Sequence, residues 1–72
     1  MKGKELRVMR KRLGWTQVEM AKALRSTANT VARWERGERN ITEPMAKFIE
    51  TVYLADVESL FKVFFSKIDT LL

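Results

Sequence analysis

The sequence predicts an all-α fold, a compact domain of five helices. Apolar residues recur at spacings of three and four, threonines and an aspartate stand where helix caps are expected, and glycines follow the periodic segments. Seventy-two residues are enough for one domain only, so we expect a single domain over residues 1–72. Because the chain has no cysteine, its core must depend on helix packing or on oligomerisation rather than on disulfides.

The first expected helix covers residues 3–13, where Leu6 and Leu13 lie on one side at helical spacing. Gly14 follows at the position where a left-handed residue commonly ends a helix. Trp15 stands where an apolar contact often accompanies such an end. The pattern predicts a well-defined helix end.

The second expected helix begins after Thr16. Thr16 and Glu19 have the spacing of a capping box, in which the threonine oxygen accepts from a helical amide and the glutamate reaches back to the cap. Met20, Ala21 and Leu24 form the apolar side of this helix. The small alanine is expected to let a neighbouring helix approach closely.

The third expected helix follows after a short turn. Thr27 is suited to cap it, Gly37 is suited to end it, and Val31 and Trp34 fall on its inner side. Residues 17–36 therefore form a unit of two short helices that can cross at a steep angle.

A fourth helix is expected after Thr42, with Pro44 in its first turn, where a missing amide proton is harmless. The chain is then expected to turn at residues 55–57, because Asp56 can cap a fifth helix over about residues 57–71. The apolar side of the fourth helix is expected to comprise Met45, Phe48, Ile49 and Val52.

The fifth helix carries more apolar residues than one helical side requires. Either the short domain needs them to complete its core, or they pack against a second copy of the chain. The second interpretation makes this helix a dimerisation element and predicts a homodimer. The candidate interface residues are Leu60, Phe61, Phe64, Phe65 and Ile68.

Basic residues are concentrated in the first part of the chain. Residues 1–40 carry eleven lysines and arginines against four glutamates, whereas residues 41–72 carry three against five acidic residues. The basic part is the expected partner-binding part, although such an excess also occurs on surfaces that contact only solvent.

The chain has no cysteine and no histidine, which argues against several classes of enzyme and metal-binding protein. The usual acid, base, nucleophile and zinc-ligand roles lack residues, so we expect no enzyme, no catalytic residue, no metal site and no small-molecule cofactor. No run approaches the ~20 apolar residues that a membrane helix needs. We therefore expect a soluble, cytoplasmic protein without membrane contact.

The segment TANTVARWERG, residues 27–37, has two contrasting sides. On a helix that advances ~100° per residue, Asn29, Arg33 and Arg36 share one side. Val31 lies nearly opposite and is expected to be buried. The free side carries groups that suit base edges and phosphates, which favours DNA as the partner.

The stretches LGWTQVEMAKAL and TANTVARWERGERN resemble the helix-turn-helix family of phage Cro and repressor proteins, transcriptional regulators of the xenobiotic-response-element type. The resemblance covers roughly residues 6–54. It implies a lambda-repressor-like DNA-binding domain with its helix-turn-helix at residues 17–36, and double-stranded DNA as partner. The matching positions are Leu13, Gly14, Thr16, Gln17, Glu19, Ala21, Leu24, Thr30, Val31, the run from Arg33 to Gly37, Arg39 and Asn40.

The resemblance implies that the helix of about residues 28–36 reads the major groove through Ala28, Asn29 and Arg33. Asparagine can pair with adenine, arginine with guanine, and the alanine methyl can meet a thymine methyl. The position that matches Gln17 binds a phosphate in the family. Our full set of expected phosphate contacts is Gln17, Thr27, Thr30, Arg36, Arg39 and Asn40.

Several of these residues have a simpler interpretation. Asn29 can serve only the first turn of its helix, and Arg33 can contact a phosphate instead of a base. Capping nearly suffices to explain Thr27, and Thr30 can pack beside Trp34. The sequence leaves these alternatives open.

The resemblance also implies a structural ion pair. The helical angle of Glu35 places it beside Val31, where an unpaired carboxylate is costly. The arginine that matches Arg10 pairs with this glutamate in the family, which removes Arg10 from the expected DNA contacts.

One position departs from the family pattern. Arg25 stands in the turn where glycine is usual. It must therefore adopt a left-handed backbone, at a cost of about 1 kcal/mol relative to glycine.

Together these observations predict a sequence-specific DNA-binding regulator, with repression as the expected mode, whose two copies place their recognition helices in half-sites about 34 Å apart. The alternative is an antitoxin-like protein-interaction module whose apolar C-terminal helix binds a partner protein. The oligomeric state of the isolated protein separates the two.

Overall fold

The computed structural model describes the backbone of residues 1–71 and the side chains of residues 1–58. Within residues 1–71 the chain forms four helices and no strand. The helices are α1 (Gly3–Arg12), α2 (Gln17–Ala23), α3 (Ala28–Glu35) and α4 (Glu43–Leu71). The all-α prediction is confirmed.

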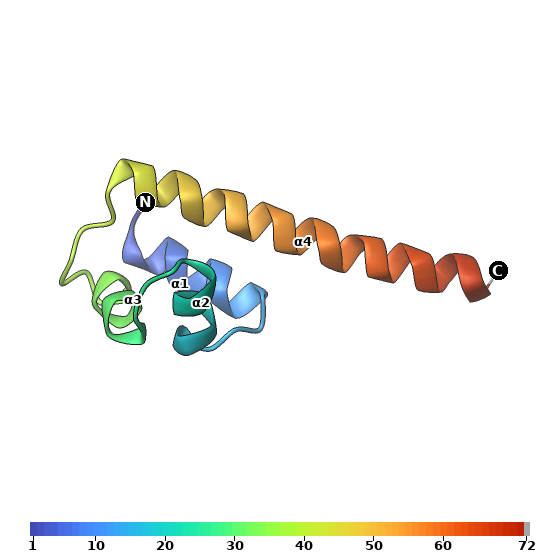
Figure 1. Ribbon diagram of the computed structural model, residues 1–72, viewed down its shortest axis with the longest axis horizontal. Coiled ribbons are helices and arrows are strands. Elements are labelled where there is room, and N and C mark those ends of the chain that lie inside the picture. Colours follow the sequence, from blue (N-terminus) through green and yellow to red (C-terminus); the bar gives the residue numbers. More distant parts are fainter. Residues whose placement is uncertain (72) are drawn as a thin grey trace.

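Helices α1, α2 and α3 form a small body, and α4 lies across this body before running well beyond it (Figure 1). The length of α4 sets the long dimension of the molecule, which measures 49 × 21 × 20 Å. The chain begins beside the first turns of α4, where Met1 and Ala46 line the same shallow depression. Within the described residues, no helix is both long and apolar enough to cross a membrane.

The prediction of five helices was wrong, because the fourth and fifth are one continuous helix. The expected turn at residues 55–57 is absent, and Asp56 lies inside α4. Neither glycine nor proline occurs there to end the helix, and an aspartate in a helix interior costs only a fraction of a kcal/mol. A residue suited to capping was therefore not sufficient to interrupt the helix.

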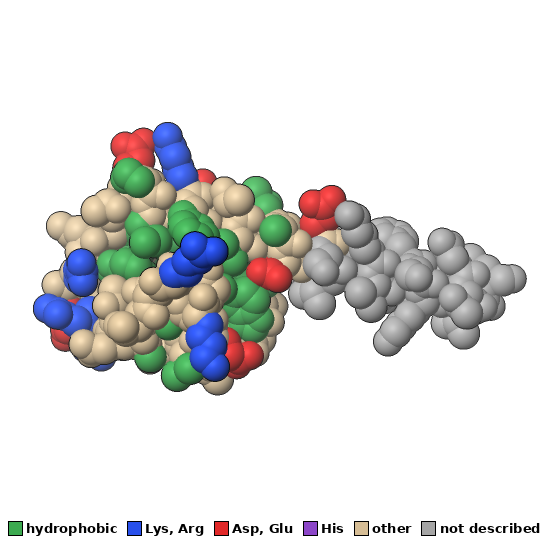
Figure 2. Space-filling model, viewed as in Figure 1, with side chains coloured by type: hydrophobic (Ala, Val, Ile, Leu, Met, Phe, Trp, Pro, Cys, Tyr) green, Lys and Arg blue, Asp and Glu red, His purple; other side chains and the backbone are tan. Residues whose placement is uncertain are grey.

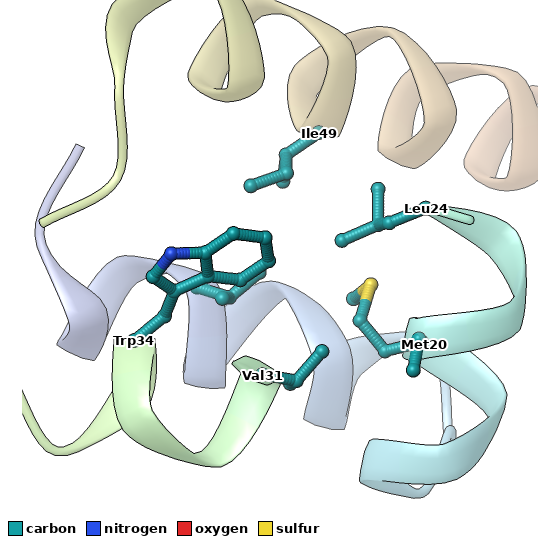
Figure 3. Close-up of a cluster of buried hydrophobic side chains, with 7 residues drawn as sticks. Met20, Leu24, Val31, Trp34 and Ile49 are labelled. Carbon is teal, nitrogen blue, oxygen red and sulfur yellow. The ribbon is translucent and has the colours of Figure 1, made fainter. Parts of the chain in front are cut away.

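A core of buried side chains joins the body to the first half of α4. Leu6 of α1 and Val31 of α3 are 0% exposed, and Ile49 of α4 is 1% exposed. Figure 3 shows Ile49 pointing down from α4 toward Trp34 and Met20. Burying each such side chain stabilises the fold by ~1.5–3 kcal/mol. The core comprises Leu6, Met20, Ala21, Leu24, Val31, Trp34 and Ile49.

The inner side of α4 is rotated from the expected one. Ile49 is buried, and Met45 and Val52 are partly buried as predicted, but Phe48 is 39% exposed and Ala46 is buried. On a helix of ~100° per residue, Ala46 lies about 60° from Ile49 and Phe48 about 100° on the other side. The buried side of α4 is therefore centred near Ile49, with Ala46 at one edge, and Phe48 lies outside it.

The helix ends follow the predicted chemistry. Gly14 is left-handed, with φ +72°, and the amide of Trp15 donates to the carbonyl of Arg10 at 3.1 Å. The capping box is complete, because the Thr16 hydroxyl accepts from the Glu19 amide at 3.1 Å and the Glu19 carboxylate accepts from the Thr16 amide at 3.0 Å. These contacts confirm the predicted end of α1 and the predicted start of α2.

Gly3 has a packing role that the sequence did not suggest. A Cβ atom at this position would collide with the carbonyl oxygen of Trp34 and lie 2.9 Å from that of Glu35. The first turn of α1 therefore lies directly against the last turn of α3. Only glycine permits this approach without a shift of the backbone.

Candidate nucleic-acid interface

The link between α2 and α3 is a tight turn built on a left-handed arginine. Arg25 has φ +55°, as expected for its place in the turn. Its amide donates to the carbonyl of Lys22 at 3.2 Å, and the amide of Ser26 donates to the carbonyl of Ala21 at 2.8 Å. These two bonds satisfy carbonyls at the end of α2 and turn the chain directly into α3.

Two threonines organise the start of α3. The Thr27 hydroxyl accepts from the amide of Thr30 at 3.2 Å and donates to the Thr30 hydroxyl at 3.0 Å. The predicted capping role of Thr27 is therefore present in the structure. The Thr30 hydroxyl proton remains free to reach another acceptor, such as a phosphate oxygen.

Helix α3 is buried on one side and open on the other. Val31 and Trp34 are 0% and 5% exposed, whereas Asn29 and Arg33 lie on the exposed side. The side chains of Asn29 and Arg33 form no hydrogen bond or ion pair within the part of the chain whose side chains are described. Ala28 is partly exposed at the first position of the helix. The buried side fixes the helix and leaves these three side chains available.

The buried ion pair between Arg10 and Glu35 holds α3 against α1. Arg10 Nε donates to Glu35 Oε2 at 2.7 Å and Arg10 Nη2 donates to Glu35 Oε1 at 3.0 Å, while Arg10 Nη1 donates to the Trp15 carbonyl at 2.9 Å. The two side chains are 12% and 5% exposed. The hydrogen bond to Glu35 raises the pKa of Arg10, against the opposing effect of burial. The structure thus contains the ion pair that the family resemblance implied.

A contact that the sequence did not suggest ties Gln17 to this ion pair. Gln17, the first residue of α2, donates from Nε2 to Glu35 Oε1 over a long 3.4 Å. The start of α2 and the end of α3 are therefore linked through one carboxylate. In the side-chain amide of Gln17, the second Nε2 proton and the oxygen Oε1 have no other partner among the described residues. No local sequence pattern signals a contact between residues eighteen positions apart.

The end of α3 brings an acidic residue back to the basic face. Gly37 is left-handed, with φ +76°, and the Glu38 amide donates to the Arg33 carbonyl at 2.9 Å. Glu38 then receives two hydrogen bonds from Arg36, Nε to Oε1 and Nη2 to Oε2, each of 3.0 Å. These bonds lower the pKa of Glu38, and the charge of Arg33 adds to the effect. The sequence alone did not indicate this contact of Glu38.

The remaining predicted phosphate contacts lie after α3. Arg39 and Asn40 are exposed in the connection to α4, and no side-chain hydrogen bond holds them within the described part of the chain. The face seen in Figure 2 carries separate lysine and arginine side chains with hydrophobic side chains between them. Basic charge alone does not outline one patch on that face, so the exposed side of α3 defines the candidate interface.

No group of carboxylates suited to a metal ion occurs among residues 1–58. The candidate dimer residues Leu60, Phe61, Phe64, Phe65 and Ile68 lie on α4 beyond the residues whose side chains are described.

Two short helices joined by a tight turn, with the second anchored on one side and polar on the other, define a DNA-binding helix-turn-helix domain of the transcription-regulator class. A family model described as helix-turn-helix matches residues 6–60, and the chain belongs to this family. The match confirms the resemblance to Cro and repressor proteins that the sequence indicated. Comparisons with curated proteins and with solved structures found no match.

Proposed function

We propose that this protein is a sequence-specific repressor that binds double-stranded DNA as a dimer and inserts α3 into the major groove. The main support is that α3 has two different sides. Val31 and Trp34 are buried, whereas the exposed side chains of Asn29 and Arg33 form no hydrogen bond or ion pair among the described residues. A helix held rigidly on one side presents its other side at low entropic cost. The proposed location of this repressor is the cytoplasm.

In this proposal three residues of α3 read bases. Asn29 makes a bidentate contact with adenine, Arg33 makes one with guanine, and the methyl of Ala28 meets a thymine methyl. Ala28 and Asn29 occupy the first turn of α3, the end that enters the groove in helix-turn-helix complexes. Arg33 lies four residues after Asn29, so the two side chains share one side of the helix.

The proposed phosphate contacts surround this reading side. They fall in three places: the start of α2, the start of α3 and the chain that follows α3. Contacts at both ends of a recognition helix set its register on the duplex and carry no sequence information themselves. The residues are Gln17, Thr27, Thr30, Arg36, Arg39 and Asn40.

Selection of bound sites from random duplexes, repeated with variants, tests this proposal. Arg33→Ala should relax base preference at one operator position and cost ~1–3 kcal/mol of binding free energy. Lys47→Ala is the matched control, because Lys47 is an exposed cation on α4, which packs on the core side of α3. The proposal fails if Arg33→Ala leaves both affinity and base preference unchanged.

Dimerisation through the second half of α4 is the other part of the proposal. A module this small offers a limited interface, so two copies on two half-sites supply specific affinity. The extension of α4 beyond the body and the 64% exposure of Leu54 support a partner for this helix. Sedimentation equilibrium should show a dimer, and Phe64→Glu should convert it to a monomer. A monomeric wild-type protein would instead favour the antitoxin-like alternative, in which α4 binds another protein.

A further inference from the structure

Glu38 and Arg36 form an exposed pair at the edge of the proposed DNA-binding face. Their side chains are 56% exposed for Arg36 and 52% for Glu38, and both hydrogen bonds between them measure 3.0 Å. The left-handed Gly37 makes this pairing possible, because it folds the chain back over the end of α3. The pair thus depends on three consecutive residues and on no distant element.

The carboxylate of Glu38 occupies the donors that a phosphate would use. A guanidinium binds carboxylate and phosphate in the same way, through two parallel N–H donors directed at two oxygens. Arg36 Nε and Nη2 are both directed at Glu38. A DNA phosphate that approaches Arg36 in this arrangement must first displace Glu38.

Displacement is feasible because the pair lies in solvent. Exposed ion pairs are weak, since water and salt screen them and both side chains lose freedom when they pair. Glu38 is ionised at neutral pH, as an exposed carboxylate ordinarily is, and the hydrogen bonds from Arg36, with a smaller effect of the Arg33 charge, lower its pKa further. The competitor is therefore weak and always charged.

We propose that Glu38 acts as a built-in competitor of the DNA backbone at Arg36, and that it lowers the affinity for all DNA sequences to a similar degree. This inference rests on the proposed function, in which Arg36 contacts a phosphate. Glu38 sets how tightly the protein holds DNA without changing which bases it reads. As a consequence, the protein should dissociate from one DNA site and move to another more quickly, while its preference among base sequences stays the same.

Glu38→Gln tests this directly, because glutamine keeps the size of the side chain and removes its charge. Binding should be measured by fluorescence anisotropy with two duplexes, one selected from random sequence and one of mixed sequence. We expect Glu38→Gln to bind both duplexes about two- to tenfold more tightly than the wild type. The slope of log K against log salt should steepen by up to about 0.9 per copy, as for one more neutralised phosphate.

Two further variants show whether the effect passes through Arg36. Glu50→Gln removes an exposed charge of the same sign from α4 and should leave affinity unchanged. Arg36→Gln should weaken binding, and adding Glu38→Gln to it should give no further gain. Far-UV circular dichroism checks that all variants keep the wild-type helix content.

Three results would overturn the inference: no gain from Glu38→Gln, an equal gain from Glu50→Gln, or a full gain that persists in the Arg36→Gln background. Each of them is compatible with a DNA-binding protein whose base preference depends on Arg33. Failure of the wild type to bind any duplex contradicts the proposed function itself. The two failures are therefore distinguishable in one set of titrations.

Discussion

The Arg10–Glu35 and Arg36–Glu38 pairs each join a guanidinium to a carboxylate through two hydrogen bonds, but their surroundings differ. The first pair is 12% and 5% exposed and connects α1 to the end of α3. The second is 56% and 52% exposed and connects two residues separated by one glycine. The same two-bond pairing therefore occurs at two very different levels of exposure to water.

From this difference we expect burial to decide how much each pair contributes to stability. Removing one partner from a buried pair leaves a charge without water or counter-charge, which is strongly destabilising. Removing one partner from an exposed pair leaves a charge that water solvates at once. We therefore expect the Arg10–Glu35 pair to stabilise the fold strongly and the Arg36–Glu38 pair to contribute little to it.

The largest expected effect comes from breaking the buried pair on one side. Arg10→Met should cost ~3–5 kcal/mol of unfolding free energy, because it leaves the Glu35 carboxylate buried and unpaired. A chain of this length has only about 4–11 kcal/mol in total, so the variant should be largely unfolded on mild heating. Urea denaturation followed by circular dichroism measures the loss.

The double variant Arg10→Met/Glu35→Leu is the control for this first prediction. It removes both charges, so much of the lost stability should return, because no ion then remains buried. A loss below about 1 kcal/mol in Arg10→Met alone would contradict the structural role assigned to this pair.

A substitution at Gly3 tests whether the close contact between the start of α1 and the end of α3 matters for stability. Replacing a helical glycine with alanine usually stabilises a helix by ~1 kcal/mol. Gly3→Ala should instead destabilise the protein by ~1–3 kcal/mol, because the new methyl group meets the carbonyl oxygens of Trp34 and Glu35. Lys4→Ala, at the next and exposed position, should be nearly neutral. Thermal unfolding of the two variants distinguishes packing from helix propensity.

The exposed pair should contribute far less to stability. Arg36→Gln is expected to lower the unfolding free energy far less than Arg10→Met does, because screening by water already weakens the pair. Urea denaturation of Arg36→Gln and Arg10→Met compares the stability lost at the exposed pair with that lost at the buried pair. Comparable losses in the two variants would show that burial does not separate the pairs.

The smallest expected effect is a dependence of stability on acid pH. Hydrogen bonds to Arg36 lower the pKa of Glu38, and hydrogen bonds to Thr16 lower the pKa of Glu19, both below the ordinary 4.5. A lowered pKa in the folded state gives stability that is present above the unfolded pKa and is lost as pH falls through the folded value. Stability should therefore decline below about pH 4.5, and Glu38→Gln should flatten that decline slightly. If the wild type and Glu38→Gln lost stability identically as the pH falls, the Arg36–Glu38 pair would add nothing to stability.

How far the sequence predicts this structure depends on the range of each interaction. The capping box of Thr16 and Glu19 and the left-handed Gly14 lie within a few residues of the helix ends that they control, and both were predictable. The missing turn at residues 55–57 shows the limit of such signals. Asp56 suits a cap, yet nothing nearby stops the helix, so α4 continues.

The candidate site divides in the same way. The inner and outer sides of α3 follow from helical angle alone, which placed Val31 inside and Asn29 outside. The hydrogen bond from Gln17 to Glu35 joins α2 to α3, and no sequence pattern predicts it. The pairing of Arg36 with Glu38 is local, but it depends on the turn at Gly37 and on side-chain geometry.

The sequence by itself determined where α1, α2 and α3 lie along the chain, which side of α3 is buried and where basic charge accumulates, because these depend on residues within one or two helical turns. The tertiary structure alone decided that α4 turns Ala46 rather than Phe48 toward the core, and that Gly3 meets the end of α3. Such choices depend on how whole helices rotate and approach one another. That rotation is fixed by the packing of side chains from distant parts of the chain, which no local spacing records.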